Sequence, residues 1–347
     1  MPKIASSAAR LQGKRRVMCE ISDFFGMMGG RHASLEQMKC TAGVLMSLGI
    51  TDFTSYYSVP LRPNQPADFT PKSRRFSVEE YRQYTDYVSR VNTFLGEGAF
   101  APRTAVLHPI VSVWANFTPP TRSMYEPHPS ERVRFIDDSF ADLCRDLLQH
   151  QIDFDIVDEK SVADARMKAK QLFVGAQEYD VLVLPPMDTI RLRTLETIRQ
   201  CAEEGGSVFT HPLAPTFAAE GSDKDNQIKS MMGRIAAKGG LHQATPKSTP
   251  MTYLVNSRIP PQCLLNPPSP NILCKAVSRK EGKMYFLVNA SSEAYTGACT
   301  LLSIGKPAAF DPATGKEQAV TSQKVGRSRT QIGLTLQPFA SLFVEFR

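Results

Sequence analysis

Residues 3–25 read KIASSAARLQGKRRVMCEISDFF, and this stretch bears most directly on the fold. The apolar run Val17-Met18-Cys19 ends in an acid, Glu20, and a glycine-rich segment follows within a few residues. A strand that ends in an acid and opens into a loop is how a (β/α) barrel presents a catalytic carboxylate at its C-terminal face. We therefore predict a strand over residues 17–20 with Glu20 at its end. On spacing alone, an ordinary surface glutamate is the alternative.

Two strand–helix units follow one another in the first hundred residues. Residues 35–48 place apolar side chains at helical spacing, with Ser34 as the N-cap. Residues 50–57 are rich in aromatic residues and threonine, which predicts a strand, and Ser77 is expected to cap a second helix. A whole barrel has eight such units, so we expect residues 1–99 to form only part of one. Its open strand edges would favour self-association.

The middle of the chain alternates strands and helices more regularly. Its best strand, YDVLVL over residues 179–184, is a continuous apolar run, as expected for a strand covered on both faces. The same pattern predicts further strands over residues 104–107, 153–157 and 207–210 and helices over residues 140–150, 190–204 and 226–237. This alternation favours a doubly wound parallel sheet, which we assign to residues 100–245.

The last hundred residues change character. Short strands are predicted over residues 272–278, 283–289, 298–303, 308–310 and 331–346. Turn sequences such as Asp311-Pro312-Ala313-Thr314-Gly315 separate them. Short strands with regular turns are typical of an antiparallel β-sandwich, which we place in residues 246–347.

The composition narrows the function classes. The 347 residues are 42% hydrophobic and 22% charged, as in ordinary globular proteins. The net charge of +7 comes from scattered basic residues without interleaved aromatics, so nucleic acid is a poor candidate partner. No apolar run approaches the length of a membrane span, and no secretory signal is visible. The cellular location stays open, including a periplasmic or secreted parent enzyme.

Metal and cofactor chemistry is only weakly indicated. The seven cysteines show no CxxC spacing, which argues against zinc and favours buried, reduced thiols. An acidic group at Asp153, Asp155, Asp158 and Glu159 has oxygen ligands for calcium but lacks the spacing of an EF-hand loop. We therefore expect no cofactor, with calcium as the minor alternative and solvated strand-end acids as the major one.

Several stretches resemble the rhamnosidase-type glycoside hydrolases of family 106. They are ASSAARLQGKRRVMCE (5–20), AVLHPIVSVWANFTPP (105–120), DDSFADLCRDLLQHQIDFDIVDE (137–159), EYDVLVLPP (178–186), YFLVNASSEAYTGACTLL (285–302), FDPATGKE (310–317) and LTLQPFASLFVEF (334–346). The resemblance implies the end of a catalytic barrel, then a flavodoxin-like α/β domain, then a β-sandwich. It also implies that the chain is the C-terminal portion of such an enzyme.

Glycoside hydrolysis uses two carboxyl groups that flank the scissile bond. The resemblance makes Glu20 one of them, as base or nucleophile on the seventh barrel strand. Asp23 and Asp52 are the nearest alternatives for the other, although related barrels place the partner acid on the fourth strand. Ser55 stands where family members tend to carry a sugar-binding histidine.

Other candidate sugar-binding residues lie at strand ends and in loops. Arg31 and His32 belong to the glycine-rich loop, and such loops often carry binding residues. Tyr56 and Tyr57 end the second strand. Trp114, the only tryptophan, either stacks on a sugar or anchors a domain interface.

Two functions from different classes fit these observations. One is a glycoside hydrolase, or its C-terminal fragment, that acts on a carbohydrate, with an α-L-rhamnoside as the first substrate to test. The other is a non-catalytic carbohydrate-binding or scaffolding protein. An α/β-hydrolase mechanism is disfavoured because the sequence contains no GxSxG motif.

Overall fold

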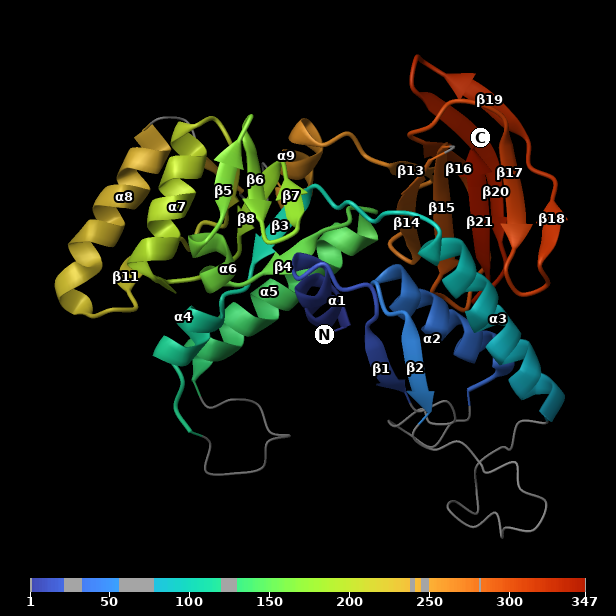
Figure 1. Cartoon of the computed structure of the whole chain (residues 1–347), viewed down its shortest axis with the longest axis horizontal. Coiled ribbons are helices and arrows are strands. Elements are labelled where there is room, and N and C mark those ends of the chain that lie inside the picture. The colour runs from blue at the N-terminus through green and yellow to red at the C-terminus, as the bar shows by residue number, and fades with distance from the viewer. Residues whose placement is uncertain are drawn as a thin grey trace, which may run out of the picture. The chain divides into compact units, whose positions relative to one another are not determined.

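The computed structural model describes residues 2–21, 33–55, 78–119, 130–237, 241–244, 250–280 and 282–346. The chain divides into two compact units (Figure 1). The first unit contains residues 1–6, 14–100 and 262–347, and the second contains residues 7–13 and 101–261. Among the described helices, none has both the length and the apolar character needed to cross a bilayer.

A five-stranded parallel sheet forms the centre of the second unit. Its strands run in the order β12 (Leu241–Gln243), β10 (Ser207–Thr210), β8 (Val181–Leu184), β3 (Thr104–Leu107) and β4 (Asp155–Val157). Numbered along the chain this is 2-1-3-4-5, the strand order of flavodoxin-like sheets. The predicted doubly wound parallel sheet is therefore present.

Helices cover both faces of this sheet because its central strand is apolar on both sides. Leu182 and Leu184 of β8 belong to one buried cluster, which includes side chains of α7 (Leu192–Glu203) and α8 (Asp225–Ala237). Val181 and Val183 belong to another, which includes side chains of α5 (Glu131–Gln149) and α9 (Met251–Arg258). The strand predicted over residues 179–184 begins only at Val181, because Tyr179 is the last residue of another strand, β7.

Smaller elements complete the second unit. They are α4 (Ile110–Ala115), α6 (Glu159–Ala163), the 3-10 helix η1 (Ser222–Lys224), the antiparallel strands β5 (Arg166–Lys168), β6 (Gln171–Val174) and β7 (Gln177–Tyr179), and the parallel pair β9 (Thr189–Ile190) and β11 (Phe217–Ala218). Helix α5 begins nine residues before the predicted start at 140, because the Ser130 hydroxyl accepts the Val133 N–H as an N-cap.

Helix α1 (Pro2–Leu11) was not expected from the sequence. Residues 7–13 pack with the second unit. The Ser7 hydroxyl accepts a hydrogen bond from the Ile156 N–H of edge strand β4 at 2.9 Å, and Arg10 forms an ion pair with the buried carboxylate of Asp155. These partners lie about 150 residues away in the chain, so a local sequence pattern cannot predict the contacts.

The first unit contains the predicted antiparallel sandwich. One sheet has the order β13 (Cys263–Asn266), β16 (Tyr295–Leu301), β20 (Arg329–Leu336) and β19 (Ser322–Val325). The other has the order β14 (Ile272–Arg279), β15 (Gly282–Asn289), β21 (Ser341–Phe346), β17 (Pro307–Asp311) and β18 (Lys316–Gln318). The single strand predicted over residues 331–346 was wrong: β20 and β21 are separated by a turn in which Phe339 has a positive φ of 61°.

Helices α2 (Leu35–Ser47) and α3 (Val78–Gly96) pack on the second of these sheets. Strand β15 alternates, so Phe286 and Val288 join the helix cluster while Tyr285 and Leu287 face the sandwich interior. The Tyr87 hydroxyl of α3 lies 2.9 Å from the Ser341 hydroxyl. The predicted Ser34 cap of α2 is confirmed as a capping box with Gln37.

Strands β1 (Met18–Ile21) and β2 (Asp52–Ser55) form a two-stranded parallel sheet near these helices (Figure 1). Ile21 and Phe53 pack against the cluster formed by α2, α3 and the sandwich. Among the described residues no closed barrel is present, so this strand pair and its two helices are all that corresponds there to the predicted partial barrel.

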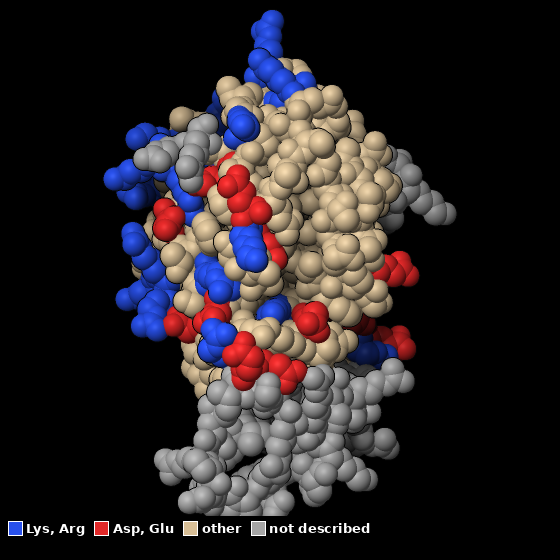
Figure 2. Space-filling model, turned by 90° about the vertical axis from the view of Figure 1, so that its right-hand side faces the viewer, with Lys and Arg blue, Asp and Glu red and all other residues tan. Residues whose placement is uncertain are grey.

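The sandwich also has a polar face with little charge. A ladder of side chains crosses the outside of the four-stranded sheet, with Gln323 donating to Gln331 at 2.6 Å and Gln331 donating to Thr300 at 3.3 Å. Leu264, opposite Thr300 in the register, extends this row to β13. Figure 2 shows a broad area without lysine, arginine, aspartate or glutamate on the sandwich end of the molecule.

Candidate functional site

The open face of the β1–β2 sheet carries the predicted acid. The strands pair with Met18 opposite Asp52 and Glu20 opposite Thr54. Side chains alternate along a strand, so these four share one face while Cys19, Ile21 and Phe53 share the other. Met18, Glu20 and Thr54 are exposed. The face opposite the helix-packed core therefore presents polar side chains and one methionine.

Glu20 lies one residue before the end of β1. Its carboxylate is exposed and makes no hydrogen bond or ion pair with any described residue. The parallel pairing means that the carboxyl ends of β1 and β2 lie at the same edge of the sheet. Glu20 is therefore an acid near the C-terminal edge without a partner among the described residues, one residue before the strand end rather than at it as predicted.

Asp52 is engaged instead by Arg16. The Arg16 guanidinium donates two hydrogen bonds to its carboxylate, the one from Nε measuring 3.2 Å, and the Thr51 hydroxyl donates a third at 2.7 Å. These bonds hold the pKa of Asp52 below its ordinary value. Asp52 and Glu20 lie two residues apart on neighbouring strands, so their Cα atoms are about 8 Å apart at usual strand spacing and rise.

Most of the other predicted binding residues fall outside the described residues. These are Asp23, Arg31, His32, Tyr56 and Tyr57. Trp114 is described and belongs to the second unit, where it lies on the short helix α4 rather than in a loop. Its side chain is 61% exposed, so it is not part of that unit's core.

A second polar cluster lies at the carboxyl ends of β3 and β8. This position is the topological switch point of the sheet, where such folds bind ligands. The nearly buried carboxylate of Asp188 accepts hydrogen bonds from Arg132 Nε at 2.7 Å, from Asn116 and from Thr189. The Ser112 hydroxyl accepts the Asp188 and Thr189 N–H groups. The chain's own polar groups thus occupy this switch point.

His108 and His211, which directly follow β3 and β10, form no hydrogen bond with this cluster among the described residues. Burial lowers the pKa of His108 and of His211, which keeps both rings neutral at pH 7. His108 packs against Phe140 with ring centroids 5.2 Å apart, and His211 Nδ1 accepts the Leu213 N–H at 3.0 Å. Both therefore have structural contacts that account for their positions.

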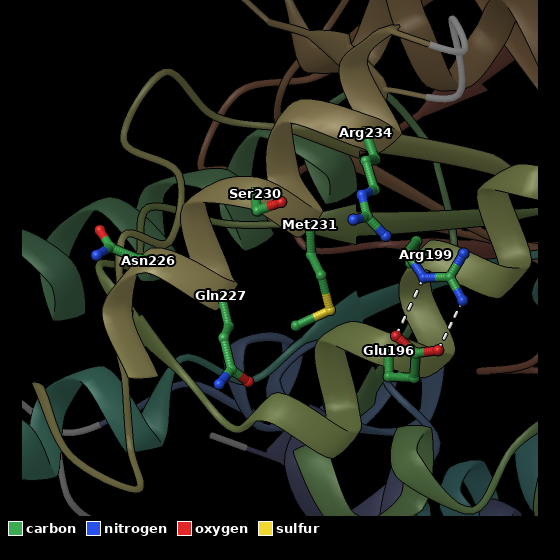
Figure 3. Close-up of a pocket in the computed structure, with 7 residues that line it drawn as sticks. All are labelled: Glu196, Arg199, Asn226, Gln227, Ser230, Met231 and Arg234. Atoms are coloured by element: carbon green, nitrogen blue, oxygen red, sulfur yellow. Dashed lines mark hydrogen bonds and ion pairs between the residues drawn. The ribbon is translucent and has the colours of Figure 1, made fainter. Parts of the chain in front are cut away.

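A groove of about 460 Å³ lies between α7 and α8 and was not predicted from the sequence (Figure 3). All but one of its lining residues have polar or charged side chains: Glu196, Arg199, Asn226, Gln227, Ser230, Met231 and Arg234. Arg199 donates to Glu196 at 3.0 Å and 2.6 Å and also pairs with Glu203. The hydrogen bonds from Arg199 lower the pKa of Glu196, so this ion pair stays formed at neutral pH.

The described residues contain no cluster of histidine, cysteine and acidic side chains able to hold a metal ion. In the acidic group singled out from the sequence, Asp155 is fully buried and paired with Arg10, and Glu159 accepts the Arg191 N–H at 2.9 Å. Asp158 caps α6 through the Ser161 N–H. The expected solvation of all four acids was therefore wrong, because Asp155 and Glu159 have internal partners.

Neither a protein-family model nor a curated protein sequence matches this chain. Solved structures do. A rhamnosidase from Novosphingobium sp. PP1Y has a TM-score of 0.68 at 16% identity, over 99% of this chain and 32% of the rhamnosidase. A beta-galactosidase from Bacillus circulans sp. alkalophilus has a TM-score of 0.58 at 9% identity, over 99% and 57%. Alpha-L-fucosidase isoenzyme 2 from Paenibacillus thiaminolyticus has a TM-score of 0.57 at 10% identity, over 99% and 58%.

The chain has a glycoside-hydrolase-like fold. The three structures just named are glycoside hydrolases, and each matches nearly the whole chain. The chain spans about a third of the rhamnosidase and somewhat more than half of the other two. At these identities the likeness concerns the fold. The predicted resemblance to glycoside hydrolases is confirmed at that level, and the rhamnosidase-type assignment stays a prediction.

Proposed function

We propose that this chain is part of a glycoside hydrolase and that Glu20 is one of its catalytic carboxylates. In this proposal β1 and β2 are strands of a (β/α) barrel, with their exposed face turned to the barrel interior. A carbohydrate is the substrate, and an α-L-rhamnoside is the first to test. The likeness to three glycoside hydrolases over 99% of the chain supports the class.

The observation that carries the proposal is the state of the Glu20 carboxylate. It lies on the open face of a parallel strand pair, near the carboxyl edge, without a partner among the described residues. Barrel enzymes place catalytic acids at that edge. An unengaged carboxylate is free to act as a base or as a nucleophile towards an anomeric carbon.

Asp52 is assigned a different role. Arg16 holds its carboxylate ionised, and an ionised carboxylate cannot protonate a leaving group. Asp52 is therefore not the general acid of this mechanism. In the proposal it holds Arg16 beside the open face, where the guanidinium can bind a sugar hydroxyl.

The test is hydrolysis of a panel of aryl glycosides, including the α-L-rhamnoside, by the full chain and by Glu20→Gln. Because general acid–base groups contribute roughly 10²- to 10⁴-fold, Glu20→Gln should lower kcat by at least about a hundredfold. Thr54→Val is the matched control, since Thr54 lies opposite Glu20 on the same face. Partial recovery of Glu20→Ala with azide would identify a nucleophile or base. Equal turnover by Glu20→Gln and the parent chain would remove Glu20 from the mechanism.

The alternative is a non-catalytic carbohydrate-binding protein, which the sparsely charged outer face of the sandwich favours. Amide and hydroxyl side chains at Gln323, Gln331 and Thr300 form a row able to exchange hydrogen bonds with neutral sugars. In that case insoluble neutral polysaccharide should retain the chain, Gln331→Glu should weaken retention, and Glu20→Gln should not. Turnover that is lost in Glu20→Gln would favour the glycoside hydrolase over the binding protein.

A further inference from the structure

The groove between α7 and α8 has one guanidinium whose N–H donors make no hydrogen bond to a described residue. On the α7 side, Arg199 is occupied by Glu196 and Glu203. On the α8 side, Arg234 is exposed and makes no hydrogen bond or ion pair with any described residue. Figure 3 shows its guanidinium extending towards Arg199 across the upper part of the groove. Arg234 acts on Glu196 only through its charge, so the groove offers the N–H donors of one guanidinium beside the Arg199–Glu196 ion pair.

The lining groups other than the two arginines and Glu196 are neutral. Gln227 and Ser230 lie on the same face of α8 as Arg234, because the three recur three or four residues apart. Asn226 adds a second amide at the start of that face. None of these side chains hydrogen-bonds to a described residue, and all are exposed. Met231 is partly buried, and its thioether lies between Gln227 and the Glu196–Arg199 pair in Figure 3.

We propose that this groove binds an acidic saccharide, a sugar ring that carries one carboxylate. A guanidinium pairs with a carboxylate through two parallel hydrogen bonds. The amides and the hydroxyl can donate to and accept from sugar hydroxyl groups. Met231 offers a polarizable apolar surface for the C–H face of a sugar ring. A groove of about 460 Å³ lies within the usual range for small-molecule sites.

Other ligand classes fit these groups less well. A nucleic acid needs several cations along its backbone, whereas this groove is lined by two arginines, of which Arg199 is paired with Glu196 and Glu203. A neutral sugar would leave the guanidinium unused. The groove belongs to the second unit and Glu20 to the first, and the proposal does not depend on the catalytic assignment.

The experiment is an NMR titration of the ¹⁵N-labelled full chain with D-galacturonic acid, D-galactose and sodium acetate in parallel. Galacturonic acid should shift amide resonances of α7 and α8. Galactose, which lacks the carboxylate, and acetate, which lacks the ring, should each bind at least about tenfold more weakly, the factor expected from losing one hydrogen bond to a charged group.

Two variants separate a specific contact from general charge. Arg234→Gln should weaken galacturonic acid binding by at least about tenfold. Lys229→Gln removes the same charge from an exposed position of α8 outside the groove and should leave affinity within about twofold of the parent chain. Equal losses in the two variants, equal binding of acetate or galactose, or no shifts in α7 and α8 would each overturn the proposal.

Discussion

Arg10 of α1 forms an ion pair with Asp155 of β4, whose carboxylate has no solvent exposure. The Tyr179 hydroxyl donates to the same carboxylate at 3.0 Å, while Arg10 Nε and Nη1 are buried and have no hydrogen-bond partner among the residues that the structure describes. The arginine side chain itself is 11% exposed. Buried ion pairs of this kind contribute little net stability. Removing one partner is nevertheless strongly destabilising, because the other charge stays buried without a partner.

Replacement of Arg10 by methionine should therefore destabilise the protein strongly. Asp155 would remain as a buried charge with one neutral donor, and such changes cost about 3–5 kcal/mol. Urea unfolding should show the loss as a lower midpoint. The double variant Arg10→Met with Asp155→Leu should recover much of it, because no charge remains buried. Arg145→Gln, which breaks an exposed pair with Asp142, is the control and should change the unfolding free energy by less than about 1 kcal/mol. A small effect of Arg10→Met would contradict this account.

Arg16 should control the titration of Asp52. Its hydrogen bonds depress the pKa of the folded-state carboxylate below the unfolded value. This contribution to stability is therefore present above the unfolded pKa, near 4, and is lost as the pH falls through the folded-state pKa. In Arg16→Gln the pKa of Asp52, followed by carbon NMR of its carboxyl group, should rise towards the ordinary value. The outcome that contradicts this is an unchanged Asp52 titration.

Gly43 should not tolerate alanine although it lies inside α2. In an exposed helix that substitution would stabilise by about 1 kcal/mol. Here a Cβ atom would stand 2.6 Å from the Tyr87 hydroxyl, which itself contacts Ser341. Gly43→Ala should therefore lower the melting temperature, and Tyr87→Phe in the same chain should relieve part of the clash. If Gly43→Ala raises the melting temperature, the contact between α2 and α3 is looser than described.

Local signals carried much of the fold. The capping box at Ser34 and the apolar run ending at Leu184 correspond to helix α2 and strand β8, as predicted. Both signals depend on residues that are neighbours in the sequence. Helix α1 was missed because the side chains that it buries include the polar Lys3, Ser6 and Ser7, and because the partner of Arg10, Asp155, is 145 residues away in sequence. The turn at Phe339 was missed because it uses a positive φ without glycine.

The candidate sites divide in the same way. Glu20 could be singled out because a strand-end acid is visible in sequence, whereas the engagement of Asp52 by Arg16 depends on how residues 36 positions apart meet. The groove residues of α7 and α8 read as ordinary solvated helix faces. The periodic spacing of Gln227, Ser230 and Arg234 was the one available signal, and it does not distinguish a groove wall from an exposed surface.

The open face of β1–β2 is the expected route of self-association. Met18 is 63% exposed there, and two parallel strands leave backbone groups available at their edges. A second copy could cover this face, so the chain should show concentration-dependent association on sizing with light scattering. Met18→Lys should reduce it, because burying a lysine at such a contact is unfavourable. Ile304→Lys is the control, since Ile304 is also exposed, at 59%, but lies in the sandwich. Monodisperse monomer at all concentrations, or equal effects of the two lysine variants, would show that this face does not mediate association.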